Sequence, residues 1–186
     1  MEKYFIFLDI DGTLWDNSEN PFPLIKSDKL NTNSVSAVNF LAEQLKNNGF
    51  CPEIVVISKQ REHWNYCTKL LHSHGLNPEL QLIKLPIGKF TRGERISLLL
   101  HDASHNKDIY TLHRNFTVFD YLKRDYACKC NNYVVIDDRP EELRNIPEKN
   151  YIQTNIDNGR LKQEMVVNYL NSQNLKVETP TKEKTK

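Results

Sequence analysis

Short apolar runs alternate along the chain with segments whose apolar residues recur every three or four positions. The short runs are typical of buried parallel strands, and the longer spacing is typical of amphipathic helices. The apolar runs cover residues 3–9, 53–58, 80–85, 133–137 and 151–154. The helical spacing covers residues 34–49, 61–75, 117–128, 140–146 and 159–173. This alternation predicts an α/β fold, a doubly wound, Rossmann-like parallel sheet of about five strands with helices on both faces.

Length and local composition favour one domain. A chain of 186 residues is long enough for a single core and short for two. We expect residues 1–174 to form that domain. Residues 175–186 are charged, broken by proline and free of aromatic residues, so we expect a disordered tail. Residues 86–114 interrupt the alternation and are predicted to form a small lid with a short helix over 93–103.

The charge and the hydropathy limit the possible partners and locations. A formal net charge of +1 gives no general attraction to nucleic acid or to a membrane. No stretch approaches the roughly 18 apolar residues of a membrane span. The N-terminal apolar run is interrupted by Asp9 and Asp11 and makes a poor signal peptide. We therefore expect a cytoplasmic protein with no membrane partner, whose four cysteines are reduced thiols.

Two pairs of acidic residues follow apolar strands. Asp9 and Asp11 lie two positions apart, so in an extended strand they point to the same face. Gly12 allows the chain to turn sharply after them. Asp137 and Asp138 end the fourth apolar run and should lie at the same edge of the sheet, where open α/β sheets bind ligands. Carboxylates gathered in this way repel one another unless a hard cation lies among them, and Mg²⁺ favours such oxygen ligands.

These residues resemble the motifs of the haloacid dehalogenase superfamily, over residues 4–170. The first motif is similar to the sequence of residues 9–14, Asp-Ile-Asp-Gly-Thr-Leu. The second is an apolar strand ending in a hydroxyl residue, here Ser58, and the fourth is an apolar strand ending in the acids Asp137 and Asp138. Residues that could supply the basic third motif are Arg114, Lys107 and Lys123, of which Arg114 is preferred.

The resemblance implies a phosphatase with an aspartyl-phosphate intermediate. It makes Asp9 the nucleophile and Asp11 the general acid and base. It implies Mg²⁺ held by the carboxylate of Asp9, the main-chain carbonyl of Asp11 and Asp138. Asp137 would orient water in the metal's shell, or exchange this role with Asp138.

The same resemblance implies that Ser58 and Arg114 bind the transferring phosphoryl oxygens. Within the superfamily, the sequence is most similar to the small-cap magnesium-dependent phosphatases. It shares with that branch Thr13-Leu14-Trp15, His113-Arg114 and the paired acids followed by Arg139. It departs from the branch at Gly12, where a larger residue is usual.

The sequence does not identify the substrate. Neither insertion point is long enough for a full-sized cap, so a minimal cap and a rather open site for a phosphorylated small molecule or an exposed phosphoester are expected. Basic residues in and beside the lid segment could attract anions or be an ordinary solvated stretch: Lys84, Lys89, Arg92 and Arg95. One alternative is a nucleotide or nucleic-acid-end phosphatase, which the neutral overall charge does not favour. An alternative of another class is a non-catalytic binding protein with the same fold.

Overall fold

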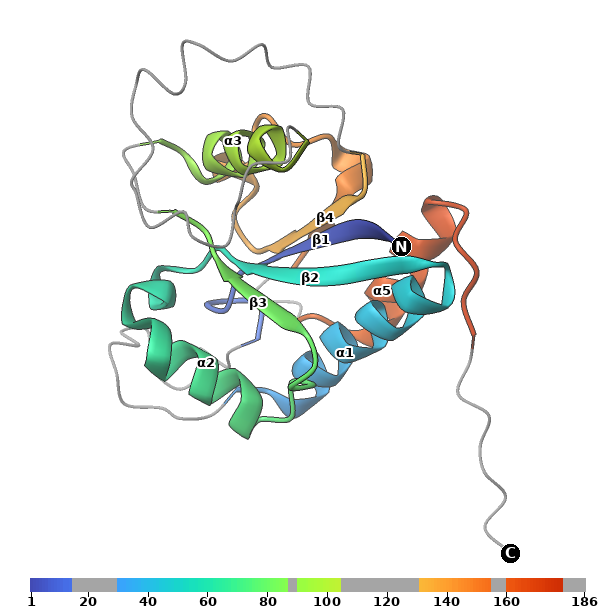
Figure 1. The fold of residues 1–186 in the computed structure, drawn as a ribbon, viewed down its shortest axis with the longest axis horizontal. Helices are drawn as coiled ribbons and strands as arrows, with labels where there is room; N and C mark the ends of the chain where they lie inside the picture. The colour runs from blue at the N-terminus through green and yellow to red at the C-terminus, as the bar shows by residue number, and fades with distance from the viewer. Residues whose placement is uncertain (15–29, 87–89, 105–130, 155–159, 179–186) are drawn as a thin grey trace, which may run out of the picture.

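The computed structural model describes residues 1–14, 30–86, 90–104, 131–154 and 160–178. Within these residues its centre is a sheet of five parallel strands in the order β3-β2-β1-β4-β5 (Figure 1). The strands are β1 (Glu2–Leu8), β2 (Phe50–Val56), β3 (Gln81–Lys84), β4 (Tyr133–Asp137) and β5 (Tyr151–Gln153). Each strand overlaps one of the five apolar runs, so the predicted parallel sheet is confirmed.

The register of the central strand decides which residues meet at the edge of the sheet. Leu8 at the end of β1 pairs with Val56 on one side and with Ile136 on the other. The ladder continues one step further, because Ile57 N–H donates to the Leu8 carbonyl and Asp9 N–H donates to the Ile136 carbonyl, both at 2.9 Å. The residues that follow β1, β2 and β4 therefore meet at the carboxyl edge of the sheet.

Helices cover both faces of the sheet (Figure 1). Alternate residues of β1 point to opposite faces. Ile6 and Leu8 share a core cluster with α1 (Thr32–Asn47), α2 (Trp64–Ser73) and α5 (Gln163–Ser172), whereas Phe5 and Phe7 share a second cluster with α3 (Arg92–Ser104). The helices predicted within residues 34–49, 61–75 and 159–173 are confirmed. The layers are those of a doubly wound fold.

Helix α3 is part of the core and not part of a lid. The sequence predicts a small lid over residues 86–114, but the described residues 92–104 form a helix with Ile96, Leu98 and Leu99 buried against the sheet. Burying each such side chain contributes about 1.5–3 kcal/mol, so the helix cannot swing away without exposing the second cluster. Residues 87–89 and 105–114 lie outside the described residues.

Two other predicted helices have different outcomes. Residues 140–146 form a single 3-10 turn, Pro140–Glu142, in place of the predicted helix. Pro147 disfavours the helical conformation of the preceding residue, Ile146, so a helix in this segment could not extend to its predicted end. The helix predicted over residues 117–128 lies outside the described residues.

The domain extends beyond its predicted boundary at residue 174. Gln44 on α1 donates from Nε2 to the Glu178 carbonyl at 3.0 Å and accepts from Glu178 N–H at 2.6 Å. Asn48 makes the same reciprocal pair with Lys176, at 2.8 and 2.9 Å. The two side-chain amides thus bind residues 176–178 as a neighbouring strand would. The rest of the expected tail, residues 179–186, lies outside the described residues.

The described residues contain no helix that is long and apolar enough to cross a membrane. Cys51 and Cys67 are free thiols. Cys128 and Cys130 lie outside the described residues.

Candidate active site

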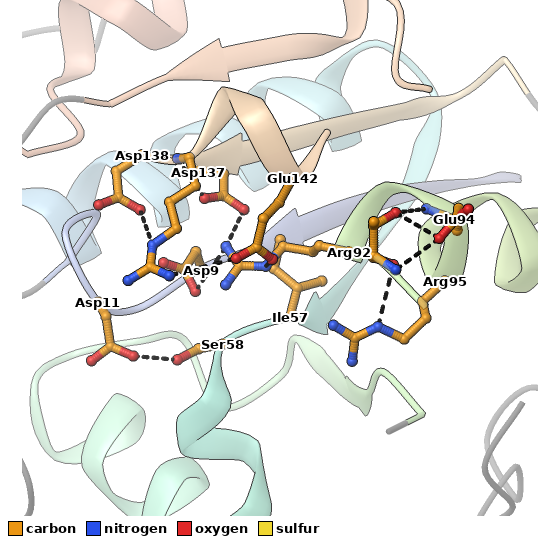
Figure 2. A network of polar contacts seen from close by, with 12 residues as sticks. Asp9, Asp11, Ile57, Ser58, Arg92, Glu94, Arg95, Asp137, Asp138 and Glu142 are labelled. Carbon is orange, nitrogen blue, oxygen red and sulfur yellow. Dashed lines mark hydrogen bonds and ion pairs between the residues drawn. The ribbon is translucent and has the colours of Figure 1, made fainter. Parts of the chain in front are cut away.

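Three aspartate side chains converge at the carboxyl edge of the sheet (Figure 2). Asp9 follows β1, Asp137 ends β4 and Asp138 comes next. One carboxylate oxygen from each residue lies within 4.8 Å of the others. Asp9 and Asp137 are buried, with exposures of 1% and 0%. Like charges repel strongly at such distances away from water, so this aspartate cluster requires positive charge nearby.

Arg92 supplies positive charge from within the protein. Its Nη1 donates to Asp137 Oδ2 and lies 3.5 Å from Asp9 Oδ1. Its Nε lies 3.5 Å from Glu142 Oε2. The guanidinium is buried, and it reaches the aspartate cluster from the first turn of α3 (Figure 2). Arg92 therefore links α3 to the ends of β1 and β4.

The local sequence fixes where α3 begins. Thr91 N–H donates to Glu94 Oε2 at 2.8 Å, and Glu94 N–H donates to Thr91 Oγ1 at 3.3 Å. This reciprocal pair is a capping box, which satisfies amide groups that the first turn of a helix leaves free. The capping box sets the first turn of α3 at Arg92 and so directs that side chain toward the aspartate cluster.

Arg92 and Arg139, whose Nε lies 4.0 Å from Asp138 Oδ1, do not fully offset the burial of the clustered carboxylates. Burial raises the pKa of Asp9 well above its usual 3.8; the guanidinium of Arg92 opposes this shift, and the neighbouring carboxylates add to it. Burial also raises the pKa of Asp137 to about 6, against the effect of Arg92. Burial lowers the pKa of Arg92, but Asp9 and Asp137 outweigh it and raise that pKa above its usual value. The cluster has capacity for a further cation.

The donor set of the cluster fits a hard divalent cation. Asp9 Oδ1 and Asp138 Oδ1 are buried and accept no hydrogen bond from the described residues. Within that part of the chain, each has only a longer ion-pair contact, Asp9 Oδ1 with Arg92 at 3.5 Å and Asp138 Oδ1 with Arg139 at 4.0 Å. A buried carboxylate oxygen that accepts no hydrogen bond is costly, and coordination to a metal removes that cost. Carboxylates, with water and substrate oxygens, are the ligands that Mg²⁺ takes in phosphoryl-transfer sites. Asp9, Asp137 and Asp138 could therefore hold Mg²⁺.

Asp11 belongs to a separate contact beside the aspartate cluster. Its carboxylate faces Ser58, whose Oγ donates to Asp11 Oδ2 at 2.8 Å (Figure 2). Gln60 Nε2 donates to the other oxygen, Asp11 Oδ1, at 3.3 Å. Ser58 lies two residues after β2 and caps the 3-10 helix that follows, accepting from Gln60 N–H at 3.2 Å. The carboxylate of Asp11 is thus not part of the aspartate cluster, and it lies next to the hydroxyl group of Ser58.

Gly12 allows the first loop to approach Asp138. Its φ is +76°, a conformation that L side chains rarely adopt. A Cβ at this position would lie 2.2 Å from Asp138 Oδ2. The absence of a side chain at Gly12 therefore makes room for one carboxylate of the cluster.

One family model matches most of the chain. Residues 5–165 match the model described as the HAD domain in Swiss Army Knife RNA repair proteins, where HAD stands for haloacid dehalogenase. The chain belongs to this family of HAD domains. No curated protein and no solved structure matches it. The predicted membership of the haloacid dehalogenase superfamily is thus confirmed, while the resemblance to the small-cap phosphatase branch stays a prediction.

The structure of this HAD domain brings together five of the six predicted site residues. Asp9, Asp137 and Asp138 form the aspartate cluster, and Asp11 and Ser58 contact each other beside it. The sixth, Arg114, lies outside the described residues, as do the other two candidates for the third motif, Lys107 and Lys123.

The residue that sequence reasoning missed is Arg92. In the sequence, Arg92 is one of several basic residues in and beside the lid segment, whereas the HAD domain places its guanidinium against Asp9 and Asp137. A signal was present in the sequence. Thr91 and Glu94 have the spacing of a capping box, which predicts a helix start at this point and a basic residue in its first turn.

Gly12→Ala should weaken Mg²⁺ binding by about tenfold or more, the usual scale for disturbing groups that hold metal ligands in place. The new methyl group would displace the Asp138 carboxylate from its position in the cluster. Titration calorimetry with Mg²⁺ measures the change in dissociation constant.

Gly49→Ala is the matched control for this substitution. Gly49 also has a positive φ, +86°, but nothing lies within 4 Å of a Cβ placed there. Both variants share the backbone cost of about 1–2 kcal/mol. Equal Mg²⁺ affinities in the two variants would show that the close approach to Asp138 is irrelevant to the metal.

Proposed function

We propose that this HAD domain is a Mg²⁺-dependent phosphomonoesterase that works through an aspartyl-phosphate on Asp9. The observation that carries the proposal is the aspartate cluster beside Arg92, in which Asp9 Oδ1 and Asp138 Oδ1 are buried and accept no hydrogen bond from the described residues. Bound Mg²⁺ would offset the repulsion between carboxylate and phosphate and polarise the phosphoryl group. The ligands we assign are the carboxylates of Asp9 and Asp138 and the main-chain carbonyl of Asp11. Asp137 orients a water in the metal's shell or exchanges roles with Asp138.

The reaction proceeds in two displacements at phosphorus. In the first, an oxygen of Asp9 forms a bond to phosphorus while the bond to the ester oxygen breaks, and Asp11 gives its proton to that leaving oxygen. In the second, Asp11 takes a proton from water, the water oxygen attacks phosphorus, and the bond to Asp9 breaks. The net products are an alcohol and inorganic phosphate.

We assign the binding of the transferring phosphoryl oxygens to two side chains, Ser58 and Arg92. Ser58 Oγ is a hydrogen-bond donor at the same edge of the sheet as Asp9. We assign to Arg92 the role that the sequence analysis gave to Arg114, because its buried guanidinium already lies 3.5 Å from the nucleophilic carboxylate. Fixed positive charge at this point stabilises the charge spread over the phosphoryl oxygens in the transition state.

We further propose a phosphate at an RNA end as the substrate. The family description names RNA repair proteins, and the phosphate at the end of an RNA strand is a monoester. A net charge of +1 gives little non-specific affinity for a polyanion. Recognition would therefore depend on groups near the site, and small sugar phosphates and nucleotides are the competing substrate class.

Phosphate release from a substrate panel tests both proposals. The panel contains RNA oligonucleotides with a 3′-phosphate or a 5′-phosphate, ribose 5-phosphate, a phosphoserine peptide and p-nitrophenyl phosphate. We expect turnover with Mg²⁺, none with EDTA, and kcat/KM highest for one of the RNA ends.

The outcomes separate the candidate functions. Metal-dependent turnover of the small esters without turnover of RNA would support the phosphatase and reject the RNA substrate. A folded protein that hydrolyses no ester and binds no Mg²⁺ in titration calorimetry would reject the phosphatase. The non-catalytic binding protein would then be the better description.

A further inference from the structure

Asp11 is held by a closed ring of hydrogen bonds that involves Gln60 twice. The Gln60 main-chain N–H donates to Ser58 Oγ at 3.2 Å, and Ser58 Oγ donates to Asp11 Oδ2 at 2.8 Å. The Gln60 side chain closes the ring by donating from Nε2 to Asp11 Oδ1 at 3.3 Å. Both oxygens of the carboxyl group therefore have a donor, and the orientation of the group is fixed.

Ser58 cannot keep its part of this ring during the reaction proposed above. A hydroxyl group has one proton to donate, and that proton is directed at Asp11. When Ser58 donates to a phosphoryl oxygen, Asp11 loses this contact. The amide of Gln60 is then the remaining described donor to the Asp11 side chain.

We propose that Gln60 is a positioning residue that keeps the Asp11 carboxyl group directed at the leaving oxygen while Ser58 binds the phosphoryl group. The inference rests on the proposed function, since it concerns the acid that this function assigns. An amide suits the task because it is neutral and orients the carboxyl group without adding charge beside the aspartate cluster. The main-chain N–H of Gln60 is hydrogen-bonded to Ser58, which caps this 3-10 helix, so the backbone that carries the Gln60 amide has a fixed position.

A loss of positioning has a distinctive effect on different esters. An alcohol is a poor leaving group, and its departure needs the proton that Asp11 supplies. p-Nitrophenol is far more acidic and leaves without that proton, so its ester is insensitive to a misplaced acid. A general loss of folding, of Mg²⁺ or of phosphate binding would instead slow both esters together.

The experiment compares Gln60→Met with the wild-type protein on two esters: p-nitrophenyl phosphate and the alcohol ester of the panel that the wild type hydrolyses fastest. Methionine has a similar length but no hydrogen-bond donor. We expect kcat/KM for the alcohol ester to fall by about 10–100-fold, within the range of a general acid's contribution, and that for the aryl ester by less than about threefold. The Kd for Mg²⁺ should change by less than about twofold, because the Asp11 side chain is not among the clustered carboxylates.

Two further variants make the comparison decisive. Gln60→Asn keeps the amide on a shorter side chain that no longer reaches Asp11, so it should behave like Gln60→Met. Glu62→Met changes an exposed residue of the same 3-10 helix, Lys59–His63, and should leave both esters unaffected.

Several results would overturn the inference. Equal losses on both esters would make Gln60 a structural residue, and no loss on the alcohol ester would make it dispensable. A wild-type protein active only on the aryl ester would leave Asp11 no leaving oxygen to protonate, and the inference would fail while the phosphatase stood. A wild-type protein inactive on every ester would overturn the proposed function and this inference with it.

Discussion

Asn in place of Asp9 should abolish phosphate release and, at the same time, raise the melting temperature of the metal-free protein. The amide nitrogen and carbonyl of Asn form no acyl-phosphate, so we expect kcat/KM to fall by about 10⁴-fold or more, as for other lost nucleophiles. Stability should rise because burial raises the pKa of Asp9 well above its usual value. A folded-state pKa above the unfolded one means that the ionised carboxylate is destabilising at neutral pH.

The gain from Asp9→Asn appears as a few degrees of melting temperature, since about 1 kcal/mol corresponds to 2–4 °C in a domain of this size. Calorimetry in EDTA measures it. Arg92 keeps its contact with Asp137 in this variant, so no buried cation is left alone. Activity that returns when Mg²⁺ is raised would contradict the assignment, because it would make Asp9 a metal ligand only.

Arg92→Met should lower both the stability and the activity. Adding Mg²⁺ should restore part of the lost stability but not the activity. Removing one partner of a buried ion pair typically costs about 3–5 kcal/mol, because the other charges remain buried without compensation. Here those charges are the carboxylates of Asp9 and Asp137. Mg²⁺ would supply positive charge to the same oxygens, so the loss of melting temperature should be smaller with Mg²⁺ than with EDTA. The phosphatase activity should fall by about 10²–10³-fold, the usual scale for a lost donor to transition-state charge.

Arg95→Met is the matched control for Arg92→Met. Arg95 is one helical turn further along α3 and is also buried, but it donates hydrogen bonds to the main-chain carbonyls of Thr91 and Pro86. Its loss should lower the melting temperature equally with and without Mg²⁺ and change kcat by less than about threefold. If the two variants respond alike to Mg²⁺, Arg92 has no special relation to the cluster.

The sequence predicted the sheet and the acidic residues because both depend on short-range patterns. An apolar run such as residues 133–137 identifies a buried parallel strand, and parallel strands must deliver Asp9 and Asp137 to the same edge. Arg92 could not be assigned in the same way, because its role depends on the packing of α3 against the second face of the sheet. The helical spacing within residues 93–103 was visible, but it does not say which face of the sheet the helix covers.

The same distinction applies to Gly12 and to the hydrogen-bonded ring at Asp11. Their local conformation can be predicted from neighbouring residues, but their contacts with distant residues cannot. A glycine after two acids predicts a turn, but the contact that excludes a side chain is made with Asp138, far along the chain. Ser58 was predicted from the strand that it ends. Gln60 carries no such signal, since its relation to Asp11 appears only when the ends of β1 and β2 lie side by side.

The attachment of residues 176–178 to α1 bears on how this domain can be tethered. Asn48, which holds Lys176, ends α1 just before β2 begins, and Glu2 begins β1 beside Phe50. Both described ends of the chain thus lie at the amino edge of the sheet, across its full length from the aspartate cluster. A fusion partner, a surface linker or a neighbouring domain joined at either of these points would lie on the side of the sheet opposite the aspartate cluster. The end of a long substrate such as an RNA strand could therefore reach Asp9 without a steric clash with the attached partner.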